Sequence, residues 1–112
     1  MKKIYIAGPM RGYPRYNFDA FYEAETFLKS VGWNPLNPAK TDESKGFKPD
    51  SDVVTQEMMM VFIRRDVDMI VDEADALCVL PGWEKSVGAN AEVALARWKN
   101  IPIYAYPEMK EI

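Results

Sequence analysis

Two short runs of residues, Lys3–Ala7 and Asp75–Leu80, carry mostly apolar side chains and are read as buried strands. A strand that is apolar on both faces is typical of a parallel sheet covered by helices on both sides. Each run leads into a turn rich in glycine and proline, Gly8–Gly12 after the first strand and Pro81–Gly82 after the second. We therefore expect the two strands to be neighbours in a parallel sheet.

Helical patterns occupy much of the chain between these strands. After Asn17 or Asp19, either of which can cap a helix, apolar residues recur at three- and four-residue spacing until Gly32. The same spacing returns in residues 53–73, as one helix or as two that break near Arg64. The sequence thus predicts at least two helices between the buried strands.

The remaining segments complete an alternating order of strands and helices. Residues 33–36 and 101–106 are expected strands, and residues 38–52 are an expected polar surface loop or lid. A further helix, which contains Glu92, follows the second buried strand. Strands separated by helices form right-handed βαβ units. We predict one α/β domain over residues 1–112, a three-layer α/β/α fold of flavodoxin or Rossmann type with a four- or five-stranded, mainly parallel sheet.

Composition excludes several kinds of chemistry. The chain of 112 residues is 48% hydrophobic and 28% charged, which is typical of a globular protein. It has no histidine and a single cysteine, Cys78, which we expect in the core. Nucleophiles activated by an imidazole and the usual zinc sites are therefore excluded. We expect no metal and no cofactor.

Charge and hydropathy narrow the choice of partners. The formal charge is −3 and the basic residues are dispersed, whereas a protein that binds nucleic acid more often has a basic stripe. No apolar run reaches the roughly 18 residues that cross a bilayer, and the first residues lack the pattern of an export signal. We expect a cytoplasmic protein that binds neither nucleic acid nor membrane.

Glu92 is the most promising candidate for chemistry. It lies one turn into a helix that begins at the carboxyl edge of the predicted sheet, where open parallel sheets bind their ligands. Taken alone, Glu92 is also compatible with a solvated helix residue, and Asp66 with a surface charge run. Tyr5 is compatible with an ordinary core residue, and Arg11 with a loop residue that faces solvent.

Three motifs together carry a family resemblance. They are the opening Tyr5–Gly12, the acidic Asp66 at the start of a helix segment that runs into Ala74–Ala76, and the pattern Ser86-x-Gly88-x-x-x-Glu92. In order and spacing the chain resembles the nucleoside 2-deoxyribosyltransferase superfamily. It is most similar to the branch of 2'-deoxynucleoside 5'-phosphate N-hydrolases, and the resemblance covers most of the domain.

The resemblance implies chemistry at the glycosidic bond of a nucleoside or nucleotide. Carried over by position, Glu92 is the nucleophile that attacks the anomeric carbon and holds the sugar as an ester. Tyr5 corresponds to the tyrosine that positions this carboxylate. Asp66 corresponds to a second acid, which binds the sugar or handles the proton of the departing base. Two carboxyl groups in unlike environments suit these two roles.

Other residues are candidates for substrate and phosphate binding. Ser86, Gly88 and Asn90 lie at the start of the Glu92 helix, where backbone N–H groups favour an anion. By resemblance, Arg11 faces the 5'-phosphate, and a serine at position 86 favours a nucleoside monophosphate over a free nucleoside. The first loop supplies the remaining candidates, which are Gly8, Met10 and Gly12.

Three functions remain open on the sequence. The first is hydrolysis of the N-glycosidic bond of a (deoxy)nucleoside 5'-monophosphate through a glycosyl-Glu92 intermediate. The second is base exchange through the same intermediate, and the third is a sensor that binds a nucleotide without turnover. Because Met58, Met59 and Phe62 form a markedly apolar helical face, we also expect a homodimer or a higher homo-oligomer.

Overall fold

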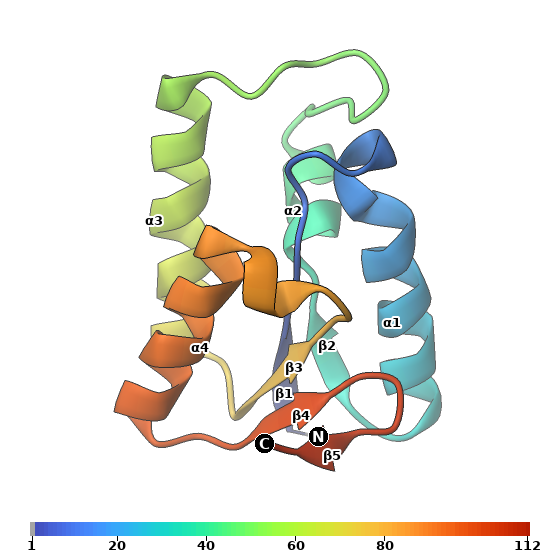
Figure 1. Ribbon diagram of the computed structural model, residues 1–112, viewed down its shortest axis with the longest axis vertical. Helices are drawn as coiled ribbons and strands as arrows, with labels where there is room; N and C mark the ends of the chain where they lie inside the picture. Colours follow the sequence, from blue (N-terminus) through green and yellow to red (C-terminus); the bar gives the residue numbers. More distant parts are fainter. Residues whose placement is uncertain (1) are drawn as a thin grey trace.

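The computed structural model describes residues 2–112 (Figure 1). In chain order, the elements are β1 (Lys3–Ala7), the 3-10 helix η1 (Pro14–Asn17), α1 (Phe18–Ser30), β2 (Asn34–Leu36), α2 (Pro38–Ser44), α3 (Gln56–Asp72), β3 (Ala76–Val79), the 3-10 helix η2 (Trp83–Lys85), α4 (Val87–Lys99), β4 (Ile103–Ala105) and β5 (Lys110–Glu111). The strands form one sheet in the order β2-β1-β3-β4-β5, in which β5 alone is antiparallel to its neighbour. Figure 1 shows α1 and α2 on one side of this sheet and α3 and α4 on the other. The predicted three-layer α/β/α fold is confirmed.

The two buried strands are neighbours, as the sequence predicted. β1 pairs with β3 in parallel, with Ile4 opposite Ala76 and Ala7 opposite Val79. Side chains alternate across a strand, so β1 contributes to a separate core on each face. Ile4 and Ile6 join the core under α1 and α2, whereas Tyr5 and Ala7 join the core under α3 and α4. This alternation sets Tyr5 on the same side of the sheet as the helices that carry Asp66 and Glu92.

Residues 38–52 differ from the predicted loop because their first half is helical. Asn37 accepts a hydrogen bond from Ala39 N through its side chain, and Pro38 occupies the first helical position. Both residues favour the start of a helix, since Pro lacks only an N–H that would be unpaired there. The result is α2, whose inner side buries Ala39 and Asp42.

The other boundaries agree with the predicted elements within a few residues, with three refinements. α3 is one unbroken helix, so Asp66 lies in its interior and not at a helix start. Asn17 precedes α1, but its side chain donates to the backbone oxygen of Pro9 instead of capping the helix. β5 was not predicted, because two exposed residues that pair with β4 carry no pattern of their own. Cys78 is fully buried, as expected.

Lys99 closes the carboxyl end of α3 from the neighbouring helix. Its ammonium donates to Ile70 O at 3.0 Å, one of the last carbonyl groups of α3, which have no partners within the helix, and to Ala74 O at 2.7 Å just beyond the helix. A cation is also favoured there by the helix dipole. We expect Lys99→Met to lower the free energy of unfolding by about 1–2 kcal/mol, measured by urea denaturation.

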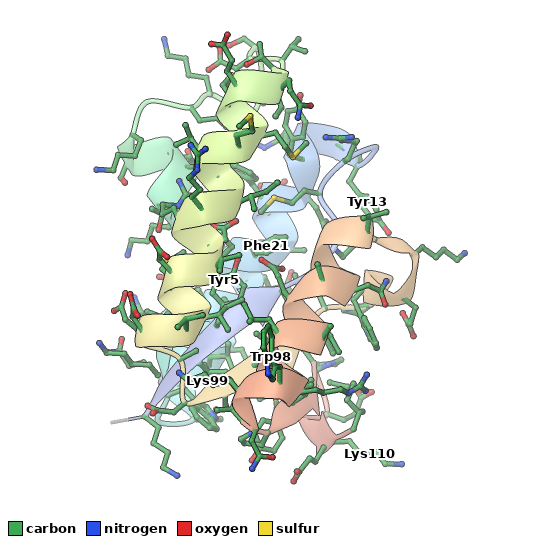
Figure 2. The ribbon with its side chains drawn as sticks, turned by 90° about the vertical axis from the view of Figure 1, so that its left-hand side faces the viewer. Tyr5, Tyr13, Phe21, Trp98, Lys99 and Lys110 are labelled. Carbon is green, nitrogen blue, oxygen red and sulfur yellow. The ribbon has the colours of Figure 1, made fainter. Side chains whose placement is uncertain are left out.

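Lys110 supplies the matched control. It is exposed on the edge strand β5, and Figure 2 shows it apart from the α3 terminus that Lys99 approaches. Lys110→Met should change the free energy of unfolding by no more than about 0.5 kcal/mol, as is usual at the surface. Equal losses in the two variants would contradict a capping role for Lys99.

Candidate active site

The loops that follow β1 and β3 meet at the carboxyl edge of the sheet. Leu80 N donates to Ala7 O at 2.9 Å, which continues the pairing of the two strands into the loops. A Cβ atom on Gly8 would lie 2.8 Å from Leu80 Cβ, closer than two carbon atoms can pack. Gly8 is therefore required for this close approach, a role different from contact with a ligand. The junction brings both predicted site loops to one edge.

Tyr5 and Glu92 form the centre of the candidate site. The Tyr5 hydroxyl donates to Glu92 Oε2 at 2.5 Å, joining β1 to the first half of α4 across 87 positions of sequence. Tyr5 is fully buried, and Figure 2 shows it between α3 and α4. Burial and the carboxyl groups of Glu92 and Asp66 raise the pKa of Tyr5 well above its ordinary value. Its hydroxyl therefore remains a hydrogen-bond donor at neutral pH.

Glu92 has an unusually high proton affinity in this position. Burial raises the pKa of Glu92 to about 8, and the negative charge of Asp66 adds to this rise. The hydrogen bond from Tyr5 acts in the opposite direction, because it stabilises the carboxylate. A carboxyl group with such a pKa, held by a buried tyrosine at a sheet edge, is typical of a functional site.

Asp66 is the second carboxyl group of the site. Burial raises its pKa to about 6, with a smaller contribution from Asp42, while Arg65 and Tyr5 lower it. Arg65 Nη2 donates to Asp66 Oδ1 at 2.9 Å, so Asp66 has a cationic partner. Between pH 6 and 8 the pair formed by Asp66 and Glu92 consequently holds about one proton.

The local sequence gave no sign of the contact that holds Arg65. The same Nη2 atom also donates to Oδ1 of Asp42, which is buried on α2. Asp66 was also compatible with a surface charge run, and Asp42 fell within the predicted loop of residues 38–52. The one available signal was the helix start at Asn37-Pro38, since a helix there turns Asp42 inward.

Two of the residues proposed for anion binding also hold the backbone around α4. Ser86 caps the helix, with its hydroxyl oxygen accepting from Ala89 N at 3.1 Å. Asn90 donates from its side-chain amide to the backbone oxygens of Glu84 at 2.9 Å and Ser86 at 2.8 Å. Gly88 lies in the exposed first turn, where a Cβ atom would meet open space. These contacts give Ser86 and Asn90 a structural role that sequence reasoning did not identify.

The first loop presents a cation near the start of α3. Arg11 is exposed, and its guanidinium lies 3.6 Å from Met59 Sδ. Gly12 has a φ of 85°, a conformation that glycine adopts without strain, and so turns the chain away from the sheet. Met10 is half-buried and packs on the core under α1. Of the loop residues predicted to bind substrate, Arg11 alone brings a charge to this edge.

Comparison with known proteins places the chain in a family. Residues 2–105 match the family described as "Domain of unknown function (DUF4406)". The chain belongs to the DUF4406 family. No curated protein sequence matches this DUF4406 domain.

A solved structure has the same fold. It is a 2-desoxiribosyltransferase from Leishmania mexicana, which superposes with a TM-score of 0.66 at 21% sequence identity. The match covers 95% of the DUF4406 domain and 64% of the transferase chain, so the domain spans less than two thirds of that protein. This likeness shows that the domain has the deoxyribosyltransferase fold.

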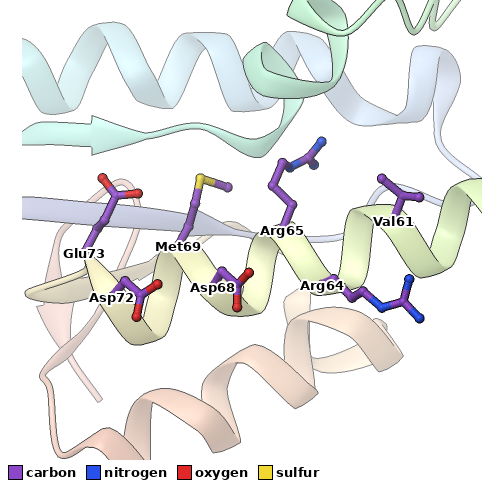
Figure 3. Close-up of a pocket in the computed structure, with 7 residues that line it drawn as sticks. All are labelled: Val61, Arg64, Arg65, Asp68, Met69, Asp72 and Glu73. Carbon is purple, nitrogen blue, oxygen red and sulfur yellow. The ribbon is translucent and has the colours of Figure 1, made fainter.

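A hollow of about 500 Å³ lies along α3, away from the Tyr5–Glu92 pair. Figure 3 shows its lining on one helix, from Val61 to Glu73, with the two basic side chains nearer the start of α3 and the three acidic ones nearer its end. Arg65, the partner of Asp66, is the single residue that lines the hollow and also contacts the candidate site.

Within residues 2–112 of the DUF4406 domain, no group of three acidic or cysteine side chains is arranged to hold a metal ion. None of the helices described there has the length and apolarity needed to cross a bilayer.

Proposed function

We propose that this domain cleaves the N-glycosidic bond of a (deoxy)nucleoside 5'-monophosphate and transfers the sugar to water through a glycosyl-Glu92 intermediate. The observation that carries the proposal is the contact between Tyr5 and Glu92, with Asp66 close enough to raise the pKa of both. Two interacting carboxyl groups that share one proton suit a nucleophile and an acid. The fold shared with a deoxyribosyltransferase supports the same kind of substrate.

In the first step, one oxygen of the Glu92 carboxylate bonds to C1' of the sugar while the bond from C1' to the base nitrogen breaks. Tyr5 holds Oε2, which leaves Oε1 free to attack. The bonding electrons leave with the base, and protonated Asp66 gives its proton to the base. In the second step, the Asp66 carboxylate takes a proton from water, whose oxygen displaces Glu92 from C1'.

Phosphate recognition is assigned to the residues around the two loops. Arg11 is exposed at the site edge, and its planar guanidinium suits two phosphate oxygens. The first turn of α4, at Gly88, offers an accessible backbone next to Ser86. The proposed specificity for a monophosphate rests on these groups, because the Tyr5–Glu92 contact suits any nucleoside.

Base exchange is the second candidate. It differs in the acceptor, because a second base in place of water attacks C1' of the glycosyl-Glu92 ester. The structural neighbour is a transferase, which favours this reaction. A nucleotide sensor without turnover would keep the binding residues and have no need of the carboxyl pair.

The deciding experiment is a panel of ribo- and deoxyribonucleoside 5'-monophosphates, with the free nucleosides alongside, in which base release is followed by chromatography. We expect release from at least one monophosphate, faster than from its nucleoside. Addition of a second free base distinguishes exchange from hydrolysis by the appearance of a new nucleotide. Tight binding without release from any member would favour the sensor instead.

We expect the rate of base release to follow a bell-shaped pH profile with its maximum at about pH 7. The limbs follow from pKa values of about 6 for Asp66 and about 8 for Glu92. In the state that holds one proton, these values place it mainly on Glu92, so the reactive form, with Glu92 ionised and Asp66 protonated, is a minor form that varies with pH in the same way. At low pH both carboxyl groups are protonated and Glu92 cannot attack. At high pH both are ionised and no acid remains to protonate the base. Initial rates from pH 4.5 to 9.5 measure both limbs, and a flat profile across pH 5–9 would contradict this protonation scheme.

We also propose that the domain forms a homodimer, through a face different from the predicted one. Met58 and Phe62 pack against the core under α1, so they are not available for a partner. Several exposed apolar side chains lie elsewhere on α3 and on α4, where Trp98 is 87% exposed (Figure 2). On α3, Val67 and Val71 are 38% and 47% exposed, and we assign the interface to these outer sides of the two helices. A monomeric mass by light scattering at micromolar concentration would contradict the dimer.

A further inference from the structure

Arg65 links the two helical layers of the molecule beside the carboxylate site. Its Nη2 atom donates both to Asp66 Oδ1 on its own helix and to Asp42 Oδ1 on α2, from the opposite side of the sheet. All three side chains are largely buried, at 19% exposed for Arg65, 20% for Asp66 and 5% for Asp42. The guanidinium also lies over the ring of Phe62, with its Cζ atom 5.2 Å from the centroid. The guanidinium is therefore held on several sides.

This arrangement is costly for stability. Burying charged groups removes their hydration, and ion pairs of this kind often stabilise a fold no more than apolar side chains would. In addition, the Nε atom of Arg65 is buried without a hydrogen-bond partner among the described residues. An unpaired buried N–H group destabilises the folded state further. These costs make an effect of Arg65 on its neighbour Asp66 a better explanation of the arrangement than a contribution to folding.

We propose that Arg65, anchored by Asp42, is a positioning residue that fixes the carboxyl group of Asp66 relative to Tyr5 and Glu92. The inference rests on the proposed function, in which Asp66 exchanges a proton with the base and with water. Because Arg65 occupies Oδ1 of Asp66, the other oxygen, Oδ2, is left to exchange that proton. Asp42 holds the guanidinium from α2, so Asp66 is fixed by a contact that spans the sheet edge.

Four groups facing Asp66 determine how it titrates. Arg65 and Tyr5 lower its pKa, whereas the negative charge of Asp42 raises it. Glu92 faces it from α4, with its own pKa raised by the charge of Asp66. Removing Arg65 should therefore move the titration of Asp66 to higher pH, and removing the charge of Asp42 should move it to lower pH. General damage to the fold would not produce shifts of opposite sign.

The test compares Arg65→Met, Arg65→Lys and Asp42→Asn with the control Arg64→Met. Arg64 is the adjacent arginine, and Figure 3 shows that it leaves α3 on a different side from Arg65. We expect Arg65→Met to lower kcat about 10- to 100-fold with KM changed less than about threefold, because positioning affects the reaction step more than binding. Its acid limb should move to higher pH. Arg65→Lys should restore part of kcat, and Arg64→Met should match the wild type.

The variant Asp42→Asn removes the anchor and keeps the guanidinium of Arg65. Here the acid limb should move to lower pH, while kcat falls because Arg65 is no longer anchored. A folded Arg65→Met variant with unchanged kcat and an unchanged pH profile of the rate would overturn the proposal. If Arg65→Met does not fold, the other two variants decide the matter. Rate–pH profiles of Asp42→Asn and Arg65→Lys that both match the wild-type profile would overturn the proposal equally.

Carboxyl-carbon NMR titration separates this proposal from the proposed function. It follows the protonation of Asp66 directly and does not require turnover. If the wild type releases no base from any nucleotide, the proposed function fails, while opposite titration shifts of Asp66 in Arg65→Met and Asp42→Asn would still support control of Asp66 by Arg65. Titration of Asp66 that is identical in all variants would overturn the positioning role, whatever the activity.

Discussion

Replacement of Glu92 by alanine or glutamine is expected to lower the rate of base release by about 10³-fold or more, because the proposed nucleophile is lost. Glutamine keeps the size of the side chain and cannot form the glycosyl ester. It should also leave the fold intact, since burial already favours the uncharged form of residue 92, whose pKa is raised to about 8. Initial rates with the best nucleotide of the panel measure the effect.

Glu23→Gln is the matched control for this variant. Glu23 is exposed on α1, across the sheet from the site, and its replacement should leave the rate unchanged. Nucleotide binding by calorimetry should persist in Glu92→Gln, because that variant removes chemistry and not the groups assigned to the phosphate. A Glu92→Gln variant that releases base at more than a tenth of the wild-type rate would exclude Glu92 as nucleophile.

Asp66→Asn is expected to lower the rate by about 10²- to 10⁴-fold, the usual contribution of a general acid. The loss should depend on the leaving base. An N-alkylated analogue that already carries a positive charge departs without a proton, so its rate should fall much less than that of the parent nucleotide. The ratio of the two rates in wild type and variant measures the role of Asp66 in proton transfer.

Asp68→Asn is the control on the same helix. Asp68 is exposed two positions further along α3 and lines the hollow shown in Figure 3. Its replacement should affect neither substrate. Equal losses for the parent and the alkylated nucleotide in Asp66→Asn would mean that Asp66 binds the sugar and does not supply the proton.

Much of the fold was predictable because its signals are local and repeated. Two strands that are apolar on both faces identified β1 and β3 as neighbours, and the pairing of Ile4 with Ala76 confirms it. α2 was missed because its seven residues are mostly polar and begin with a proline, and the signal for a helix lay in the cap at Asn37. β5 was missed because its two residues carry no apolar pattern. They form a strand only by pairing with β4.

The contact between Tyr5 and Glu92 was expected from the family resemblance, and the structure supplies its physical reason. Tyr5 alternates with Ile4 and Ile6, so its side chain had to leave the opposite face of β1, where it meets Glu92. The contact of Arg65 with Asp42 was not predictable, because it joins residues from opposite sides of the sheet. The high pKa of Glu92 depends in the same way on burial that only the assembled layers produce.

The most direct test of the central claim is the mass of the protein during turnover. We would quench the wild type with acid while it reacts with its best nucleotide, measure the intact mass, and map any adduct by peptide sequencing. The account predicts an increase equal to the sugar phosphate, located on Glu92 and absent from Glu92→Gln. Base release with an adduct on a different residue, or with no adduct under conditions that trap an ester, would contradict a glycosyl-Glu92 intermediate.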